Sequence, residues 1–110
     1  MATVSVTLGE FEQIVLLAVL CAGREGNDAY GVNVHEEIEV RAKRTVARGA
    51  VYMTLDRLER KGLLASYLTA PTPERGGRAK RCYRVTRQAI AALHQARRTL
   101  VSLWEGLVDA

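Results

Sequence analysis

The chain contains few of the residues that mark metal sites, disulfide scaffolds or disordered linkers. Only two of its 110 residues are cysteines, and only two are prolines. Cys21 and Cys82 lie far apart, without CxxC spacing and without a histidine pattern, so we interpret both as reduced, buried thiols. The scarcity of proline argues against long disordered linkers. With 48% hydrophobic and 25% charged residues, the composition is that of an ordinary globular protein.

A long hydrophobic run is also missing. The longest apolar stretch, residues 14–22, is about half the length that a bilayer crossing needs. No basic segment followed by a signal-type apolar core stands at the start of the chain. We therefore expect one domain with a single core, located in the cytoplasm.

Enzyme motifs are absent from the sequence as well. It has no P-loop and no GxGxxG, and the GGR at residues 76–78 is too short to cradle a phosphate. The cysteines have no general base beside them in sequence. His35 has no second histidine, cysteine or carboxylate at metal-ligand spacing. We therefore expect neither an enzyme, nor a cofactor, nor a metal site.

What the chain does have is an uneven distribution of charge. Residues 1–40 carry one basic and seven acidic side chains, whereas residues 41–87 carry thirteen basic and three acidic ones. The net charge of the whole chain is only +4. A run of charge is usually a solvated face, but this one coincides with a predicted helix and hairpin, which favours binding of a polyanion.

The helix predicted over residues 48–60 has two different faces. Val51, Leu55 and Leu58 form one apolar stripe, and Gly62 follows the helix as a left-handed cap. The opposite side is polar and basic, with Gly49, Met53, Asp56, Arg57 and Arg60 on it and Arg48 and Tyr52 on its flank. A glycine inside a helix weakens it by about 1 kcal/mol relative to alanine. Gly49 is more easily understood where a partner, such as a nucleic-acid backbone, approaches closely.

Two further helices are predicted before this one. Thr7 and Glu10 have the spacing of a capping box for a helix that runs to about residue 24. This helix is apolar around nearly all of its circumference, which predicts contacts both inside and outside its own domain. Asp28 is expected to cap the second helix, from residue 29 to about residue 41.

A hairpin is predicted after the 48–60 helix. Residues 63–68 and 81–85 have strand character, and Thr45 and Val46 could add a short third strand. The connecting segment 69–80 reads TAPTPERGGRAK, whose prolines, paired glycines and charges suit a hairpin tip. Helices followed by a hairpin with a basic tip are typical of a winged helix-turn-helix.

The last predicted helix begins at the cap Thr86 and runs to about residue 108. Its apolar positions follow 3-4 spacing, with Arg97 in the remaining position of the seam: Ile90, Leu93, Leu100, Trp104 and Leu107. So small a domain cannot bury a stripe of this width by itself, so a partner is implied. The usual solution is a two-fold homodimer.

Four segments together resemble a known family. Residues 49–64 read GAVYMTLDRLERKGLL, and residues 73–86 read PERGGRAKRCYRVT. Upstream, residues 8–20 read LGEFEQIVLLAVL, and residues 29–39 read AYGVNVHEEIE. In this order and spacing they resemble the recognition helix, wing and first two helices of PadR-like transcriptional regulators, over nearly the whole chain. Ala47 and Ala89 depart from the family's usual capping serine and helix-opening glycine, but neither touches the proposed DNA face.

The resemblance implies a mainly α fold with a small β-hairpin. A winged helix-turn-helix domain would span residues 1–85, and a C-terminal dimerisation helix would span residues 86–110. Such a chain would be a sequence-specific DNA-binding regulator, expected to be a repressor. As a homodimer it would bind an inverted-repeat operator in double-stranded DNA, with helix 48–60 in the major groove and the basic wing on the backbone or minor groove.

Two sets of residues follow from the pattern and the resemblance together. The expected DNA-binding residues are Tyr30, Arg48, Gly49, Tyr52, Met53, Arg57, Arg60, Arg78, Lys80 and Arg81. The expected dimer interface consists of Phe11, Ile14, Ile90, Leu93, Arg97, Leu100, Trp104 and Leu107.

Several alternatives stay open at this point. Tyr30 either offers its hydroxyl to a phosphate or simply packs between the first two helices. The wing cations either contact phosphates or only solubilise the chain. Trp104 either packs in the dimer core or stacks against a small aromatic effector, as in some PadR-like proteins. The alternative function is a winged-helix module for protein interaction without DNA affinity.

Overall fold

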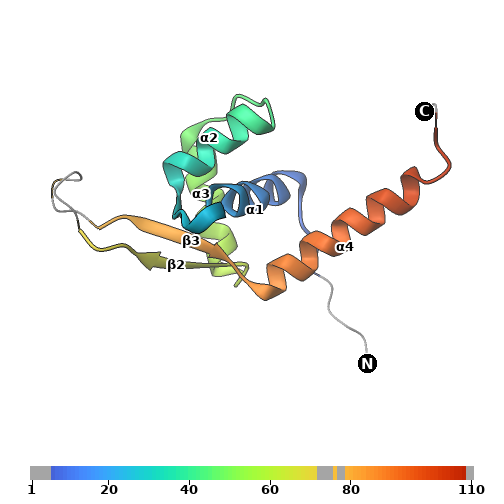
Figure 1. Cartoon of the computed structure of the whole chain (residues 1–110). Coiled ribbons are helices and arrows are strands. Elements are labelled where there is room, and N and C mark those ends of the chain that lie inside the picture. Colours follow the sequence, from blue (N-terminus) through green and yellow to red (C-terminus); the bar gives the residue numbers. More distant parts are fainter. Residues whose placement is uncertain (1–5, 72–75, 77–78, 109–110) are drawn as a thin grey trace.

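The structure is a computed structural model, and it describes residues 6–71, 76 and 79–108. Most of the helices gather beside a small sheet, and the C-terminal helix leaves this body (Figure 1). The elements in chain order are α1 (Glu10–Ala22), the 3-10 turn η1 (Arg24–Gly26), β1 (Ala29–Tyr30), α2 (Gly31–Arg41), α3 (Arg48–Arg60), β2 (Leu64–Leu68), β3 (Arg81–Val85) and α4 (Arg87–Trp104). The predicted mainly α fold with a small hairpin is therefore confirmed.

The start of α1 differs from the prediction. The Gly9 N–H donates to Glu12 Oε1 at 3.0 Å, so the reciprocal contact expected between Thr7 and Glu10 is wrong. The Glu10 carboxylate instead forms two hydrogen bonds with the Arg44 guanidinium, of 3.0 and 3.1 Å. The helix also ends at Ala22, earlier than predicted, because the chain turns into η1.

The sheet explains why α2 begins later than predicted. Ala29 pairs with Tyr83 and Tyr30 with Cys82, so these two residues form an edge strand in the order β1-β3-β2. Asp28 therefore does not cap the helix. Asn33 fixes the turn instead, because its side chain accepts from the Tyr30 N–H and donates to the Asp28 carbonyl, both at 2.8 Å.

The third strand predicted at Thr45 and Val46 is wrong, since β1 occupies the free edge of β3. The Val46 carbonyl accepts a hydrogen bond from His35 Nε2 at 2.9 Å. His35 thereby joins α2 to the segment that leads into α3. Its ring also lies 3.6 Å from the Glu39 carboxylate one helical turn later.

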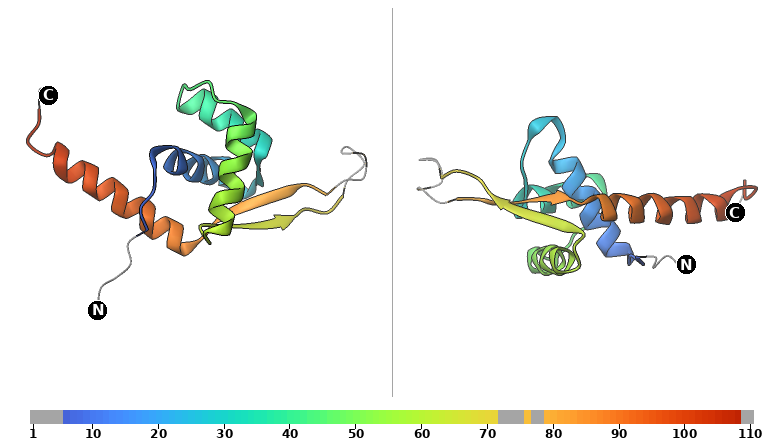
Figure 2. Two further views of the ribbon diagram at one scale, coloured as in Figure 1. Left: turned by 180° about the vertical axis from the view of Figure 1, so that it is seen from behind. Right: turned by 90° about the horizontal axis from the view of Figure 1, so that it is seen from below.

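The core is built around α1, which contacts α2, α3, β1 and β3. Figure 2 shows α1 crossing close to the base of the sheet, with α2 and α3 beside it. Large side chains from all three helices and from the turn before β2 are fully buried there: Val15, Leu16, Val34, Ile38, Val51, Leu55, Leu58 and Leu63. These contacts hold α3 with one side against the core and the other toward solvent.

Helix α4 begins as predicted, with Thr86 Oγ1 accepting from the Ala89 N–H at 3.3 Å. Only its first turns touch the body, where Ala89 and Ala92 are buried. The rest projects away from the three-helix body (Figures 1 and 2). The predicted end near residue 108 is wrong: the backbone leaves the helical conformation at Glu105, and Gly106 has a φ of +84°. None of the helices in the described ranges is long and apolar enough to span a bilayer.

Candidate nucleic-acid interface

Helix α3 has the two faces that its sequence predicts. Val51, Leu55 and Leu58 are fully buried, and Thr54 joins them. Seven residues lie on the exposed side: Arg48, Gly49, Tyr52, Met53, Asp56, Arg57 and Arg60. Of the sequence-predicted DNA-binding residues, the structure thus brings six together on one helix. A cylinder of this kind, buried on one side and polar on the other, suits the major groove of B-DNA.

Two glycines shape this surface in opposite ways. A Cβ at Gly49 would meet no atom within 4 Å, so the backbone there is open to a partner. A Cβ at Gly31 would lie 1.9 Å from Tyr52 Cε1. The Tyr52 ring therefore rests on the first residue of α2, which limits its exposed fraction to 39%. This contact fixes the ring at the junction of α2 and α3, a role that the sequence analysis missed.

Arg57 lies at the α1 side of the exposed face and is held there. Its Nε is 3.5 Å from Glu12 Oε2, and Lys61 Nζ donates to the same oxygen at 2.7 Å. Burial alone would raise the pKa of the Glu12 carboxyl, but the hydrogen bonds from Lys61 and Gly9 and the two cationic charges outweigh it, so this pKa is lowered. Glu12 thus ties the beginning of α1 to the end of α3.

The wing base is tied to α3 by a second carboxylate. Glu59 accepts from the Arg81 guanidinium and from the Ser66 hydroxyl, which come from β3 and β2. Arg81 Nη1 also lies 3.9 Å from Asp56 Oδ1. Arg81 was predicted to be a phosphate-binding cation, whereas in the structure much of its charge is compensated by carboxylates of α3. The roles of Glu12 and Glu59 in holding α3 were not predicted. Glu59 could have been noticed as an acidic residue within a basic segment, but Glu12 lies in the acidic first part of the chain.

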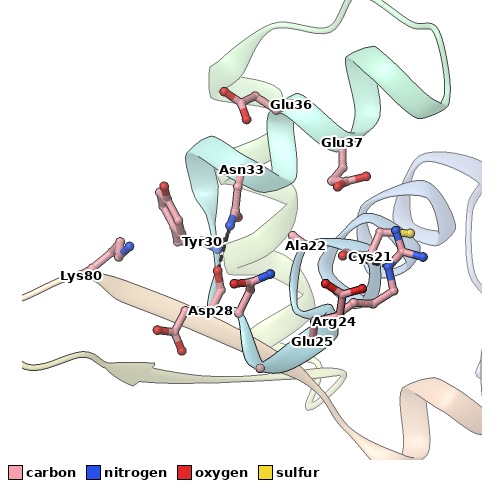
Figure 3. Close-up of a pocket in the computed structure, with 12 residues that line it drawn as sticks. Cys21, Ala22, Arg24, Glu25, Asp28, Tyr30, Asn33, Glu36, Glu37 and Lys80 are labelled. Atoms are coloured by element: carbon pink, nitrogen blue, oxygen red, sulfur yellow. Dashed lines mark hydrogen bonds between the residues drawn. The ribbon is translucent and has the colours of Figure 1, made fainter.

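Lys80 and Tyr30 lie against each other where β3 meets the start of α2. Lys80 Nζ is 3.9 Å from the centroid of the Tyr30 ring, and the ring is half-buried. Figure 3 shows the pair at one edge of a polar pocket of about 570 Å³. Its other lining side chains include Glu25, Asp28 and Glu36, so DNA would be repelled from the pocket itself. Arg78, the remaining predicted wing contact, lies outside the described residues.

No group of three or more histidine, cysteine, aspartate or glutamate side chains within the described ranges could hold a metal ion. Of the two thiols, Cys82 is buried as expected, but Cys21 is only half-buried.

One protein-family model matches most of this chain. The model of the transcriptional regulator PadR-like family matches residues 16–95, which include the helices α2 and α3, the strands and the first turns of α4. The chain belongs to the PadR-like family. It is therefore a member of a family of transcriptional regulators rather than of an enzyme family.

Solved structures of PadR-like regulators share the fold of this chain. A transcriptional regulator from Clostridium thermocellum has a TM-score of 0.66 at 19% identity, covering 87% of each chain. A PadR-like regulator from Bacillus cereus has a TM-score of 0.66 at 17% identity, covering 91% of this chain and 92% of its own. PadR of Bacillus subtilis, solved in complex with operator DNA, has a TM-score of 0.64 at 15% identity, covering 79% of this chain and 47% of its own. A comparison with curated proteins gives no match.

The PadR-like chain has a second notable surface, along α1 and α4. A groove of about 340 Å³ is lined mainly by Leu17 and Leu20 of α1 and by four of the predicted dimer residues: Ile90, Leu93, Arg97 and Leu100. Beyond it, Trp104 is 62% exposed, and Leu107 is exposed after the end of the helix. Leu107 therefore lies off the predicted helical seam.

Phe11 and Ile14, the predicted dimer residues on α1, are half-buried against the chain's own core. Leu17 and Leu20 were not predicted as interface residues, yet both are exposed. The sequence did contain an indication of this exposure, because a helix that is apolar around nearly its whole circumference cannot bury all of its leucines in its own core.

Proposed function

We propose that this PadR-like regulator is a sequence-specific DNA-binding repressor, which binds an inverted-repeat operator as a homodimer. Helix α3 enters the major groove, and the basic wing contacts the backbone or minor groove. The observation that carries the proposal is the exposed face of α3, where Arg48 and Arg60 have no ion-pair partner within the described part of the chain. Cations left unpaired on a groove-sized helix are available for phosphates and base edges.

Three further facts support DNA as the polyanion. Residues 41–87, with thirteen basic and three acidic side chains, contain both α3 and the wing. The acidic side chains fall mainly on residues 1–40, which form α1 and α2. A regulator of the same family and fold, from Bacillus subtilis, was solved bound to its operator.

The homodimer is supported by the apolar surface of α4. Leu100, Val101, Leu103 and Trp104 are each at least half exposed, and they stand on the part of α4 that projects from the body. Exposed apolar surface of this extent usually marks an interface. A two-fold partner would cover it and would place two copies of α3 on one face of DNA about one helical turn apart.

An effector site at Trp104 belongs to the same proposal. An indole at the centre of a two-fold interface would offer a flat apolar surface on which a small aromatic molecule could stack. Titration of the chain with flat aromatic compounds, followed by tryptophan emission, tests this point. Red-shifted emission that responds to such compounds supports a pocket, whereas blue-shifted emission that none of them changes indicates plain packing.

The experiment that tests DNA binding is a footprint on the promoter DNA next to the gene, at several salt concentrations. With about six to ten phosphate contacts, affinity should fall on the order of 10³-fold between about 50 and 200 mM salt. Protection should cover two half-sites related by inverted symmetry. A flat salt profile would contradict the proposed face, and protection of one half-site at saturation would contradict the dimer. No binding to any genomic fragment would leave the protein-interaction module as the better reading.

A further inference from the structure

We propose that Asp56 is a specificity-determining residue, which selects, at the position that it faces, a base with an exocyclic amino donor in the major groove, cytosine above all. This inference rests on the proposed DNA-binding function of α3. It adds a base reader that the expected set of cations and aromatic residues does not contain.

Asp56 lies on the solvent side of α3. Its side chain is 57% exposed, and it stands between Met53, which is 69% exposed, and Arg60. Residues one helical turn before and one turn after Asp56 lie on the same face of the helix as Asp56. Any duplex that meets Met53 and Arg60 therefore also meets the Asp56 carboxylate.

The other acidic side chains near this face are already engaged. Glu12 is only 10% exposed and is hydrogen-bonded to Lys61 and the Gly9 N–H. Glu59 is 28% exposed and accepts from Ser66 and Arg81. Asp56 differs from both because its nearest cation, Arg81 Nη1, is 3.9 Å away, which is too long for a hydrogen bond. Its oxygens remain available as acceptors.

The chemistry of a carboxylate decides which bases it tolerates. An ionised aspartate can only accept hydrogen bonds. In the major groove cytosine presents the N4 amino donor, and adenine presents the N6 amino donor beside an acceptor. Guanine presents two acceptors, and thymine an acceptor and a methyl group, so both would leave the carboxylate desolvated without a partner. Asp56 therefore contributes to specificity both by accepting from the right base and by penalising the wrong ones.

A phosphate contact cannot explain Asp56, because two negative charges at short range repel each other. On the exposed face of a basic helix the carboxylate weakens binding to every sequence unless a donor meets it. Arg57, by contrast, forms an ion pair with Glu12 at the edge of the face, although the sequence pattern predicts that Arg57 contacts the bases. The carboxylate stands nearer the middle of the face than that guanidinium.

The test is selection of binding sites from a library of random duplexes, with the full chain, Asp56→Asn and the matched control Glu36→Gln. Glu36 is an exposed acidic residue on α2 rather than on α3, so the control removes the same charge from a different helix. Sites selected by the wild type should carry cytosine at one symmetric position of each half-site. Asparagine both donates and accepts and pairs well with adenine, so Asp56→Asn should lower the preference for cytosine at that position about ten-fold. Glu36→Gln should leave it unchanged.

Two outcomes would overturn the inference, and a third would contradict the DNA-binding proposal on which it rests. Tighter binding of Asp56→Asn to all duplexes, with the base preference intact, would place the carboxylate against a phosphate. An equal change for Glu36→Gln would indicate a general charge effect. Failure of the wild type to select any sequence would instead contradict the DNA-binding proposal itself. Thermal unfolding of each variant, followed by circular dichroism, establishes that every comparison is made between folded chains.

Discussion

Gly31 and Gly49 lie within two sequence-adjacent helices, yet the structure requires a glycine at only one of them. At Gly31 the space for a Cβ is filled by the Tyr52 ring, whereas at Gly49 it is empty. Neither residue has a positive φ, so neither is needed for backbone conformation. The first glycine is explained by packing inside the chain. The second is explained only if something outside the chain comes close.

Gly31→Ala should destabilise the protein. The new Cβ would overlap Tyr52 Cε1, so the ring must swing away or α2 must shift relative to α3. Overpacking of this kind typically costs about 1–3 kcal/mol. Urea unfolding of the variant and the wild type measures the difference. The double variant Gly31→Ala, Tyr52→Ala is the control, since removing the ring should abolish the clash; an equal loss without the ring would contradict this explanation.

Gly49→Ala should have opposite effects on stability and on binding. The Cβ meets nothing, and alanine is favoured over glycine in a helix by about 1 kcal/mol, so the free protein should become more stable. The added methyl would nevertheless stand where a DNA backbone or base edge has to approach, and affinity for the operator should fall. Urea midpoints and operator titrations at one salt concentration measure the two effects. A gain in stability with unchanged affinity would remove Gly49 from the interface.

Among the elements, α1 and α3 depend on each other through Glu12. This carboxylate caps the beginning of α1 through the Gly9 N–H and holds Lys61 and Arg57 near the end of α3. Because its pKa is lowered in the folded chain, the ionised form stabilises the fold. The orientation of α3 relative to the core therefore depends partly on one buried negative charge, in addition to the buried apolar side chains of α3.

Glu12→Gln should reduce the pH dependence of stability. The contribution of Glu12 is fully present above its unfolded pKa, for which the ordinary value is 4.5, and it is lost as the pH falls through the lower folded pKa. The wild type should therefore lose more stability than the variant between about pH 6 and pH 3. At neutral pH the variant should be less stable by on the order of 1–2 kcal/mol. Parallel loss in both proteins would show that other carboxylates dominate the acid response.

The elements that were predicted well are those whose signals are local. The stripe of Val51, Leu55 and Leu58 with Gly62 predicted the start of α3 correctly and its end to within about one residue, and the span of β3 was also correct. The strand at Ala29 and Tyr30 was missed because it exists only by pairing with β3, far along the chain.

The candidate site follows the same rule. Which side of α3 faces solvent could be read from the spacing of its apolar residues. Which of the predicted DNA-binding cations are unpaired could not be read from the sequence, because the carboxylates that engage them come from other elements: Glu12 of α1 engages Arg57, and Glu59 of α3 engages Arg81 of β3. The early end of α4 at Trp104 was missed for a different reason, since the apolar spacing continues through Leu107 although the backbone does not.

For the molecule as a whole, α4 makes the shape elongated, with extents of 55 × 38 × 26 Å. The helix is attached by its first turns, and its apolar side chains beyond them lie in solvent. A single copy therefore leaves the apolar side chains of this part of α4 uncovered. Self-association and the geometry of operator binding are thus expected to depend on the same helix.

Trp104→Ala should weaken the dimer and leave the single chain nearly unaffected. With 62% of the indole exposed in one copy, little packing within the chain is lost. At an interface a buried tryptophan commonly contributes about 2 kcal/mol or more, which corresponds to roughly a 30-fold weaker dimer. Sedimentation over a range of concentrations measures this. Arg98→Ala, on the same helix, is the control, because the Arg98 side chain is exposed and donates to Gln95 Oε1 of its own helix at 2.9 Å. An unchanged dimer in the tryptophan variant would move the interface elsewhere.

The contact between Gly31 and Tyr52 also has a consequence for the history of the sequence. Because the ring occupies the space of a missing Cβ, the two positions are not independent, and substitution at one changes what is acceptable at the other. An intermediate with a side chain at position 31 and an aromatic ring at position 52 would be destabilised before any compensating change. Related chains should therefore seldom combine a side chain at position 31 with an aromatic ring at position 52. The α2–α3 junction, which sets the pose of the helix proposed to read DNA, would then be inherited as a unit, while Met53, Asp56 and Arg60 on the open face could diverge with the operator.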